Sequence, residues 1–321
     1  MDPVVIGIDL GGTKINTALV QGDGVILAQD YRPTLASEGL QPVVERVLDS
    51  ARQVLAQAGM TGAQVSGVGI GAPGPIDLDT GVLMSPPNLP GWERVPLGQL
   101  LEDDLGITTF LENDANAAAW GEHYFGAGRG VEHMIYVTVS TGVGGGLILD
   151  GNLYHGANGM AGEIGHIILE PDGPLCGCGS RGCLETLASG TAIARVARER
   201  VAQGVPTLMD DLAEGVPERI TAQLVVEAAR QGDKEADGIL AEAMEYLGIG
   251  MANLVNLFNP QLIVIGGGVA NIGERLFHPV RRAIERNAFR MAAQVVRVAP
   301  AELGGDVGVL GAAAVALSRL A

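Results

Sequence analysis

The sequence lacks a long apolar run, and it has no basic segment followed by an apolar one near its start. Its most apolar stretch, residues 134–149, is interrupted by glycines at positions 142, 144, 145 and 146. A membrane-spanning helix needs about 20 consecutive apolar residues, so this stretch is too short and too broken to cross a bilayer. We therefore expect a cytoplasmic protein without an export signal and without a membrane partner.

Basic residues are also scarce. The 321 residues include 20 Lys and Arg against 37 Asp and Glu, which gives a net charge of −17. A chain this acidic repels phosphate backbones, so we expect no nucleic-acid partner. Hydrophobic residues make up 47% of the chain, enough for a sizeable core, and the length predicts two domains.

Only three cysteines are present, too few and too clustered for a disulfide framework. Cys176, Cys178 and Cys183 follow His166 within a short glycine-containing segment. Three thiolates and one imidazole are a complete tetrahedral ligand set for Zn²⁺. Because this set leaves no open coordination position, the sequence predicts a structural zinc ion.

Alternating strands and helices indicate an α/β fold with mixed sheets. The pattern of strand, Gly/Thr-rich turn and strand occurs at residues 5–20 and again at residues 135–149. We interpret this repetition as an internal duplication. Helices are expected at residues 42–58, 97–105, 114–124, 235–258, 273–290 and 307–320.

The first turn is formed by residues 9–14, Asp-Leu-Gly-Gly-Thr-Lys. Glycines let backbone N–H groups approach phosphate oxygens, a Thr hydroxyl donates to them, and an Asp holds Mg²⁺ through water. Two glycines also fit an ordinary hairpin turn, and that interpretation stays open. The residues of this candidate phosphate site are Asp9, Gly11, Gly12, Thr13 and Lys14.

Asp114 lies where an expected strand ends and an expected helix begins. Asp often caps the N-terminus of a helix, and this is one interpretation of the residue. An acid at the end of a strand also points into a cleft, where it accepts a proton from a substrate hydroxyl. The sequence alone leaves both roles open.

Two carboxylates flank the cysteine segment, Glu163 before His166 and Glu185 after Cys183. They form surface salt bridges, or they accept hydrogen bonds from the hydroxyls of a sugar. Farther along, three consecutive glycines follow an apolar strand, with Gly267 in the middle. This backbone either lies flat against a nucleoside or forms a plain turn.

Taken together, these motifs resemble the ROK family of sugar kinases, within the actin/hexokinase-like superfamily, and are most similar to its bacterial glucokinase branch. The resemblance covers nearly the whole chain in the order of the family. It rests on residues 9–14, 71–74 with Asp77, 88–92, 112–116, 162–166, 176–185 and 259–268.

The resemblance implies a two-lobed actin/hexokinase-like, ribonuclease H-like fold with mixed sheets, flanking helices and an interlobe cleft. The N-terminal lobe is expected at residues 1–112, with a C-terminal helix at about 306–321 packing back on it. The C-terminal lobe is expected at residues 113–305, with the zinc loop at 166–183. A homodimer or homotetramer is implied as well.

The function implied is ATP-dependent phosphorylation of the 6-hydroxyl of glucose, with Mg²⁺ bound to ATP and Asp114 as the general base. ATP phosphates would contact Thr13, Thr141 and Gly142, and the adenosine would contact Gly267. The expected sugar contacts are Asn88, Asn113, Asp114, Glu163, His166 and Glu185.

Two alternatives stay open within this resemblance. One is a kinase for N-acetylmannosamine or another hexose, because the sugar contacts are shared. The other is a sugar-responsive ROK regulator, which carries an N-terminal helix-turn-helix. We expect no such segment here, since the first strand is predicted to begin at Val4.

Overall fold

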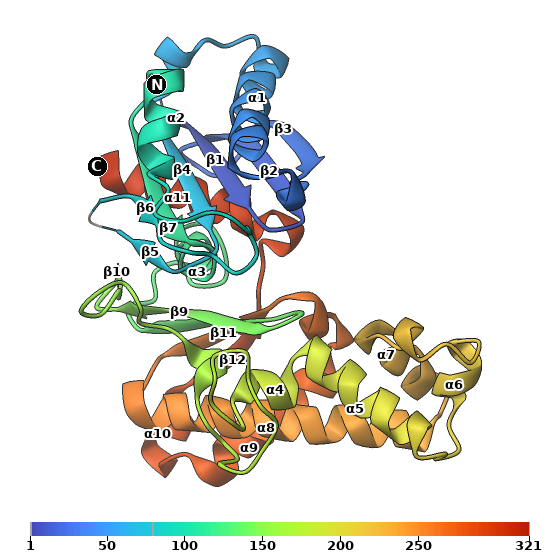
Figure 1. Cartoon of the computed structure of the whole chain (residues 1–321). Helices are drawn as coiled ribbons and strands as arrows, with labels where there is room; N and C mark the ends of the chain where they lie inside the picture. The colour runs from blue at the N-terminus through green and yellow to red at the C-terminus, as the bar shows by residue number, and fades with distance from the viewer. Residues whose placement is uncertain (1, 79, 321) are drawn as a thin grey trace. The chain divides into compact units, whose positions relative to one another are not determined.

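The computed structural model describes residues 2–78 and 80–320. The chain divides into two compact units, each assembled from separate segments of the sequence (Figure 1). The first unit contains Met1–Tyr136, Gly146–Gly162 and Ala301–Ala321, and the second contains Val137–Gly145 and Glu163–Pro300. The lobe boundary expected after residue 112 stays a prediction.

The first unit contains a five-stranded sheet of order β3-β2-β1-β4-β7. Strands β1 (Val4–Leu10), β2 (Lys14–Gln21) and β3 (Ile26–Pro33) form an antiparallel meander. Strands β4 (Gly67–Ala72) and β7 (Thr109–Asn113) extend it from β1 as parallel neighbours. The carboxyl ends of β1, β4 and β7 therefore meet at one edge of the sheet, where α/β proteins place their ligands.

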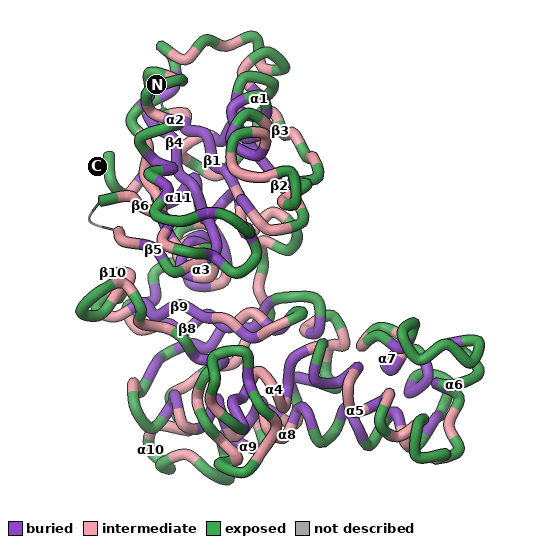
Figure 2. The backbone as a smooth tube through the Cα atoms, in the orientation of Figure 1, coloured by how far each residue is buried: buried purple, intermediate pink, exposed green. Residues whose placement is uncertain are grey.

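Helices cover both faces of this sheet. Successive side chains of a strand point to opposite faces. Accordingly Ile6 joins the core that contains residues of α1 (Leu40–Ala58), whereas Val5 joins the core that contains residues of α11 (Val307–Leu320). Most residues of β1, β4 and α11 are buried (Figure 2).

Helix α11 lies unusually close to the sheet because glycines face it. A Cβ atom on Gly69 would lie 1.8 Å from the carbonyl oxygen of Ala312, and one on Gly7 would lie 2.1 Å from that of Val309. These positions therefore exclude every side chain. Helix α3 (Asp114–Tyr124) packs against α11 in a similar way, at Gly121.

The remaining elements of the first unit are short. Helix α2 (Leu97–Leu105) packs against β7, and a two-stranded sheet joins β5 (Ile76–Asp77) to β6 (Val82–Leu83). Asn88 follows this small sheet and is exposed.

A second five-stranded sheet has the order β10-β9-β8-β11-β12. Its strands are β8 (Met134–Val139), β9 (Val143–Leu149), β10 (Asn152–Leu153), β11 (Leu262–Gly266) and β12 (Arg297–Pro300). In chain order the two sheets repeat one arrangement: three consecutive strands on one side, then two more added beside the first. The repeated arrangement predicted from the two Gly/Thr-rich turns is thus present in both sheets, and its origin by duplication stays a prediction.

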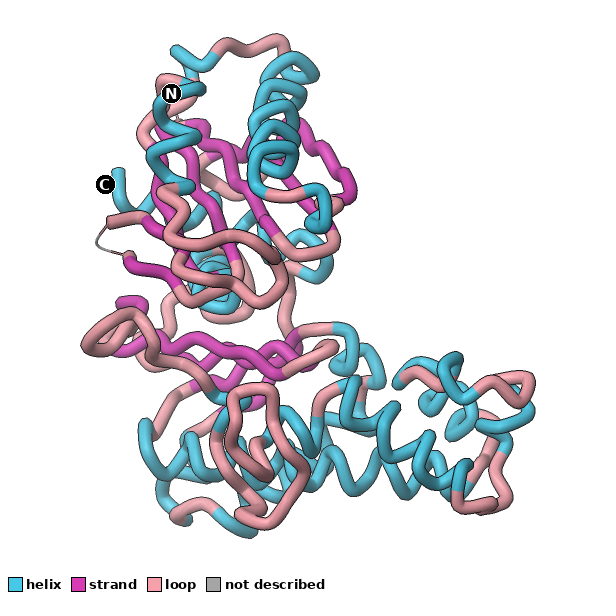
Figure 3. The backbone as a smooth tube through the Cα atoms, viewed as in Figure 1, coloured by secondary structure: helices cyan, strands magenta, loops and turns pink. Residues whose placement is uncertain are grey.

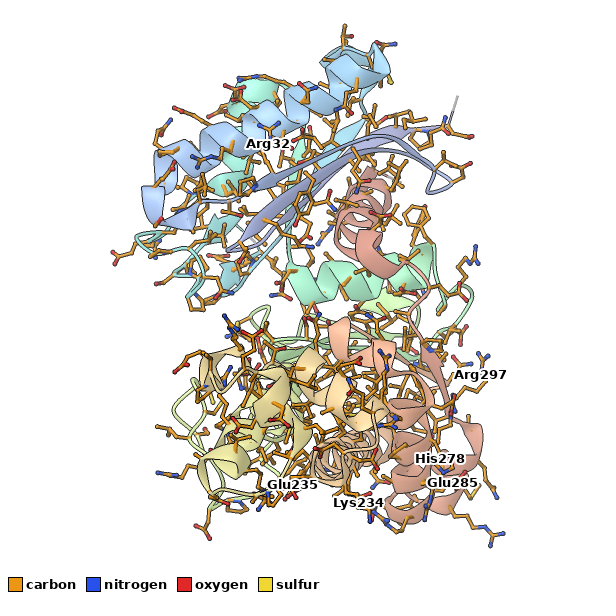
Figure 4. All side chains as sticks on the ribbon, turned by 90° about the vertical axis from the view of Figure 1, so that its right-hand side faces the viewer. Arg32, Lys234, Glu235, His278, Glu285 and Arg297 are labelled. Atoms are coloured by element: carbon orange, nitrogen blue, oxygen red, sulfur yellow. The ribbon has the colours of Figure 1, made fainter. Side chains whose placement is uncertain are left out.

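Helices make up most of the second unit (Figure 3). They are α4 (Leu184–Ala188), α5 (Gly190–Ala202), α6 (Leu208–Leu212), α7 (Ala222–Arg230), α8 (Lys234–Phe258), α9 (Glu274–Asn287) and α10 (Arg290–Val295). Helix α9 packs along α8 through its apolar face, while its residues His278 and Glu285 are exposed (Figure 4).

The predicted helices at 97–105, 114–124 and 307–320 match α2, α3 and α11. The helix expected at 273–290 instead ends at Asn287, because Ala288 and Phe289 adopt extended backbone angles before α10 begins. Helices α4 to α7 were not predicted. Among residues 2–78 and 80–320, no helix combines the length and the apolar character that a bilayer crossing requires.

Candidate active site and metal centre

The first Gly-rich turn connects β1 to β2 and closes through a hydrogen bond from the Gly11 N–H to the Lys14 carbonyl, 2.9 Å long. The Asp9 side chain is 18% exposed and lies 3.8 Å from the Lys14 ammonium. Burial raises the pKa of the Asp9 carboxyl, and the charge of Lys14 partly offsets this effect. A nearby cation would favour its ionised form, so this carboxylate fits a water-mediated Mg²⁺ contact.

The first turn also contacts two other segments of its unit. A Cβ atom on Gly308, in the first turn of α11, would lie 2.5 Å from Asp9 Oδ2, so the helix backbone begins beside the carboxylate. A Cβ atom on Gly12 would lie 2.7 Å from the Asn88 carbonyl oxygen. The structure thus brings the predicted phosphate turn against Asn88, a predicted sugar contact.

The second turn connects β8 to β9. The Ser140 N–H donates to the Gly142 carbonyl over 2.9 Å, and the Gly190 N–H at the start of α5 donates to the Ser140 carbonyl over 2.7 Å. Across the turn, Glu185 Oε2 accepts a hydrogen bond of 3.0 Å from the Val143 N–H. Glu185 is therefore attached to the turn between β8 and β9, near Gly142.

A cavity of about 480 Å³ opens beside this second turn, within the second unit. Ser140 and Thr141 line it, and the other lining residues come from α5, from α7 with its cap Thr221, and from the segment after β11. Apolar Ile193, Val226 and Val269 line it together with polar Thr221 and Asn271. The volume lies in the range of small-molecule sites, and the mixed lining suits a nucleoside whose phosphates reach the turn.

The expected adenosine contact lies next to this cavity. Gly267 has φ +85°, and a Cβ atom there would lie 2.4 Å from the Val139 carbonyl oxygen, so Gly267 packs on β8. The neighbouring Gly268 is the glycine that lines the cavity. A role of Gly267 in binding adenosine stays a prediction.

Asp114 is the first residue of α3, directly after β7. The interpretation of Asp114 as the helix cap is wrong. The cap is Asn113, whose Oδ1 accepts hydrogen bonds from the N–H groups of Ala115 and Asn116, at 3.0 and 3.1 Å. The exposed Asp114 carboxylate accepts a bond from the Ala115 N–H over 2.8 Å.

Strand register relates Asp114 to the first turn. Asp9 of β1 pairs with Gly71 of β4, and Gly71 pairs with Glu112 of β7. Neighbouring strands lie about 4.8 Å apart, so Asp9 and Glu112 are about 10 Å apart along one row. The next residues of β7, Asn113 and then Asp114, therefore emerge at the same edge of the sheet as the first turn.

The four predicted zinc ligands converge. His166, Cys176, Cys178 and Cys183 place their ligand atoms within 4.8 Å of one another. His166 Nδ1 lies 3.6 Å from Cys176 Sγ, and Cys178 Sγ lies 3.7 Å from Cys183 Sγ. In a tetrahedral site with Zn–S bonds of about 2.3 Å and Zn–N bonds of about 2.05 Å, neighbouring ligand atoms are about 3.6–3.8 Å apart. The residues present fit zinc.

The thiols differ in their surroundings. A backbone hydrogen bond from Ser180 is the main cause that lowers the pKa of the Cys178 thiol to about 7, whereas burial raises the pKa of the Cys183 thiol to about 12. His166 Nε2, the ring nitrogen away from Cys176, lies 3.9 Å from Glu163 Oε2. At this distance the Glu163 carboxylate is not hydrogen-bonded to the ring, and Nδ1 is the His166 nitrogen that faces Cys176.

The predicted site residues are thus divided between the units. The first unit holds Asp9, Gly11, Gly12, Thr13, Lys14, Asn88, Asn113 and Asp114, and the second holds Thr141, Gly142, Glu163, His166, Glu185, Gly267 and the cysteines. Sequence reasoning missed the residues of α5 and α7 that line the cavity. It also missed the hydrogen bond near Asp114 that joins the buried Glu112 to the partly buried His155.

The sequence model of the ROK family matches residues 5–319. The chain belongs to the ROK family. A glucokinase from Thermotoga maritima is 40% identical over 316 residues, which cover 98% of each chain. A xylose repressor from Caldicellulosiruptor bescii is 33% identical over 98% of this chain and 78% of its own length.

Solved structures agree with this membership. A ROK hexokinase from Thermus thermophilus has a TM-score of 0.82 and 38% identity to this chain, covering 99% of both. A ROK glucokinase from Streptomyces griseus, solved with glucose and AMPPNP, has a TM-score of 0.80 and 39% identity over 97% of this chain and 98% of its own. The predicted family and the actin/hexokinase-like α/β fold class are confirmed.

Proposed function

We propose that this chain is an ATP-dependent glucokinase that phosphorylates the 6-hydroxyl of glucose. The observation that carries the proposal is near-full-length similarity to glucokinases, 40% to that of Thermotoga maritima and 39% to the Streptomyces griseus enzyme solved with glucose and AMPPNP. The two Gly-rich turns, the nucleoside-sized cavity and the acid at the start of α3 supply the parts that such a reaction requires.

The reaction is an in-line phosphoryl transfer. The Asp114 carboxylate accepts the proton of the 6-hydroxyl while that oxygen bonds to the γ-phosphorus, and the bond from phosphorus to the β–γ bridging oxygen breaks to release ADP. Asp9 would hold a Mg²⁺ ion through water, and that ion would supply positive charge to the phosphates of ATP. The proton then passes from Asp114 to solvent.

The remaining residues bind and orient the substrates. Thr13, Thr141 and Gly142 would donate to phosphate oxygens, and the cavity beside Ser140 would hold the adenosine. The side chains that would contact sugar hydroxyls are those of Asn88, Asn113, Glu163, His166 and Glu185. The zinc ion would have a structural role, fixing His166 through Nδ1 and holding the segment that leads to Glu185.

Filling the cavity tests the nucleotide site. Ala222, at the start of α7, lines the cavity. We expect Ala222→Trp to raise the KM for ATP at least about tenfold and to leave the Kd for glucose unchanged, because the indole occupies the volume of the adenosine. Steady-state kinetics measure the first quantity and calorimetry the second. Ala241→Trp, at an exposed position of α8, is the matched control.

A sugar panel with MgATP tests the substrate. Purified protein is assayed by coupled ADP release with glucose, mannose, fructose, N-acetylglucosamine and N-acetylmannosamine. We expect the highest kcat/KM for glucose. A higher value for N-acetylmannosamine would favour the alternative kinase, and sugar binding without ADP release would favour a regulator such as the related repressor.

We also propose that the protein is a cytoplasmic homodimer or homotetramer. An apolar patch in the second unit supports assembly, since Leu257, Phe289, Met291 and Val295 are 72%, 79%, 81% and 56% exposed. A hydrogen bond from the Phe289 N–H to Asn256 holds the start of α10 beside the end of α8.

Light scattering after size exclusion tests this patch. We expect the wild-type protein to have at least twice the mass of one chain, and Phe289→Glu with Met291→Glu to shift it toward the monomer, because charge on both sides of the interface opposes its burial. Tyr31→Glu, at an exposed apolar residue of the first unit, serves as the control. An unchanged mass in the double variant would place the interface elsewhere.

A further inference from the structure

The carboxylate of Glu112 is buried beside the candidate base and has no part in the proposed chemistry. Its side chain is 2% exposed, and it ends β7 two residues before Asp114. Burying an ionised carboxylate is costly unless hydrogen bonds replace its water. The hydrogen-bond partners of Glu112 therefore stabilise its buried carboxylate and, with it, the junction of β7 and α3.

Among the residues that the structure describes, three donors surround this carboxylate, and they are divided between its two oxygens. Oε1 accepts from the Asn113 N–H at 2.9 Å and from Asn116 Nδ2 at 3.1 Å. Oε2 accepts from His155 Nε2 at 2.7 Å. Because a carboxylate only accepts, the His155 ring carries a proton on Nε2.

The donors on Oε1 belong to the start of α3. Asn113 caps the helix, and Asn116 lies in its first turn, so Asp114 stands between two residues that Glu112 holds. A shift of this carboxylate would move the cap and the first turn together. Asp114, whose carboxylate accepts a bond from the same turn, would move with them.

The donor on Oε2 belongs to a different segment. His155 lies just after β10, 43 residues along the chain from Glu112, in the stretch that runs toward Glu163 and His166. The His155 carbonyl accepts a bond of 3.1 Å from the Ala161 N–H, which closes this loop on the histidine. The hydrogen bond between His155 and Glu112 thus connects this loop to the end of β7.

We propose that the pair His155–Glu112 is a positioning element that holds the first turn of α3, and with it Asp114, in the orientation that proton transfer requires. This role rests on the proposed function. In the proposed mechanism the pair contacts neither glucose nor ATP. Without His155, Oε2 loses its donor inside the protein, and the carboxylate must rotate or admit water. Displacements of about 1 Å in a reacting group reduce rates by up to about 10²-fold.

Kinetics of His155 variants test the proposal. His155→Asn carries an amide too short to reach Glu112, and we expect kcat to fall about 10- to 100-fold with the KM for ATP within about twofold. His155→Gln places its amide nitrogen near the position of Nε2 and should recover most of the loss. The control is His133→Asn, since His133 forms an exposed pair with Asp150 on the same unit.

A double-mutant cycle separates positioning from a general effect on stability. If the pair acts through Asp114, His155→Asn has little further effect on kcat in the Asp114→Asn background. An equal loss in both backgrounds would overturn the proposal, and so would a normal kcat in His155→Asn.

Hydrogen exchange gives a readout that needs no activity. In His155→Asn the amides of Ala115 and Asn116 should exchange at least about tenfold faster than in the wild type, while those of α11 stay unchanged. Unchanged exchange in the first turn of α3 would refute the positioning role even if the chain proved not to be a kinase. Absence of sugar-dependent ADP release in the wild type would instead refute the proposed function.

Discussion

Replacing Asp114 with Asn is expected to lower kcat for glucose by at least about 10²-fold while glucose binding stays near its wild-type value. An amide has the shape of the carboxylate but cannot accept the proton of the 6-hydroxyl, and general-base catalysis contributes about 10²–10⁴ in rate. The structure indicates that this substitution leaves the cap of α3 in place. Asn113 caps α3, so the variant retains the hydrogen bonds of the cap to Ala115 and Asn116.

The measurement is steady-state kinetics together with the Kd for glucose from calorimetry. Asp210→Asn is the matched control, because Asp210 is also an exposed acid in the first turn of a helix. Loss of a first-turn acid costs only about 0.3–1 kcal/mol through the helix dipole, which both variants share. Turnover within about threefold of the wild type in Asp114→Asn would remove the residue from the mechanism.

Loss of one cysteine ligand should have the second large effect. We expect the wild type to bind about one zinc ion per chain, and Cys178→Ala to lose the metal and to melt at least about 5 °C lower. Cys178 is exposed, so the alanine removes little packing and the change in stability reports the metal. The KM for glucose should rise as well, because the segment that holds Glu185 against Val143 is released.

Elemental analysis and thermal denaturation measure these quantities. Asp172→Ala changes an exposed residue of the same loop that is not a ligand, and it should keep both the zinc and the melting temperature. Treatment of the wild type with a chelator should reproduce the behaviour of Cys178→Ala. Metal-free wild-type protein with the same melting temperature as the purified form would contradict a structural zinc site.

Local signals allowed much of the site to be predicted. The zinc ligands are close in sequence, so their convergence needed only one short loop, and the ligand atoms do meet within 4.8 Å. Helix α2 ends at a glycine and α11 is apolar along most of its length, and the predicted bounds of both helices matched. One Gly-rich turn lies near the start of each half of the chain. The similarity of these two turns made the repeated strand order predictable.

The helices between residues 184 and 230 escaped prediction for a physical reason. They are short, and glycine and proline interrupt the sequence between them, so no long periodic pattern appears. Their capping residues were the available signal. The side chains of Ser189, Thr207 and Thr221 each accept a hydrogen bond from the backbone at the start of α5, α6 or α7. These helices matter because α5 and α7 line the cavity.

The role of Asn113 and the pairing of Glu112 with His155 depend on tertiary structure. Either Asn113 or Asp114 suits a helix cap chemically, and the choice follows from where β7 stops. Glu112 and His155 meet across 43 residues, and no local pattern marks two such positions as neighbours. The tertiary structure that buries Glu112 thus identifies His155 as a candidate positioning residue that the sequence did not indicate.

The most direct test of the account is phosphorus NMR of the purified protein incubated with MgATP and glucose. We expect ADP and glucose 6-phosphate to appear in equal amounts, and ADP formation to stop when glucose is left out. ADP release that does not depend on glucose, or a phosphorylated product other than the 6-phosphate, would contradict it.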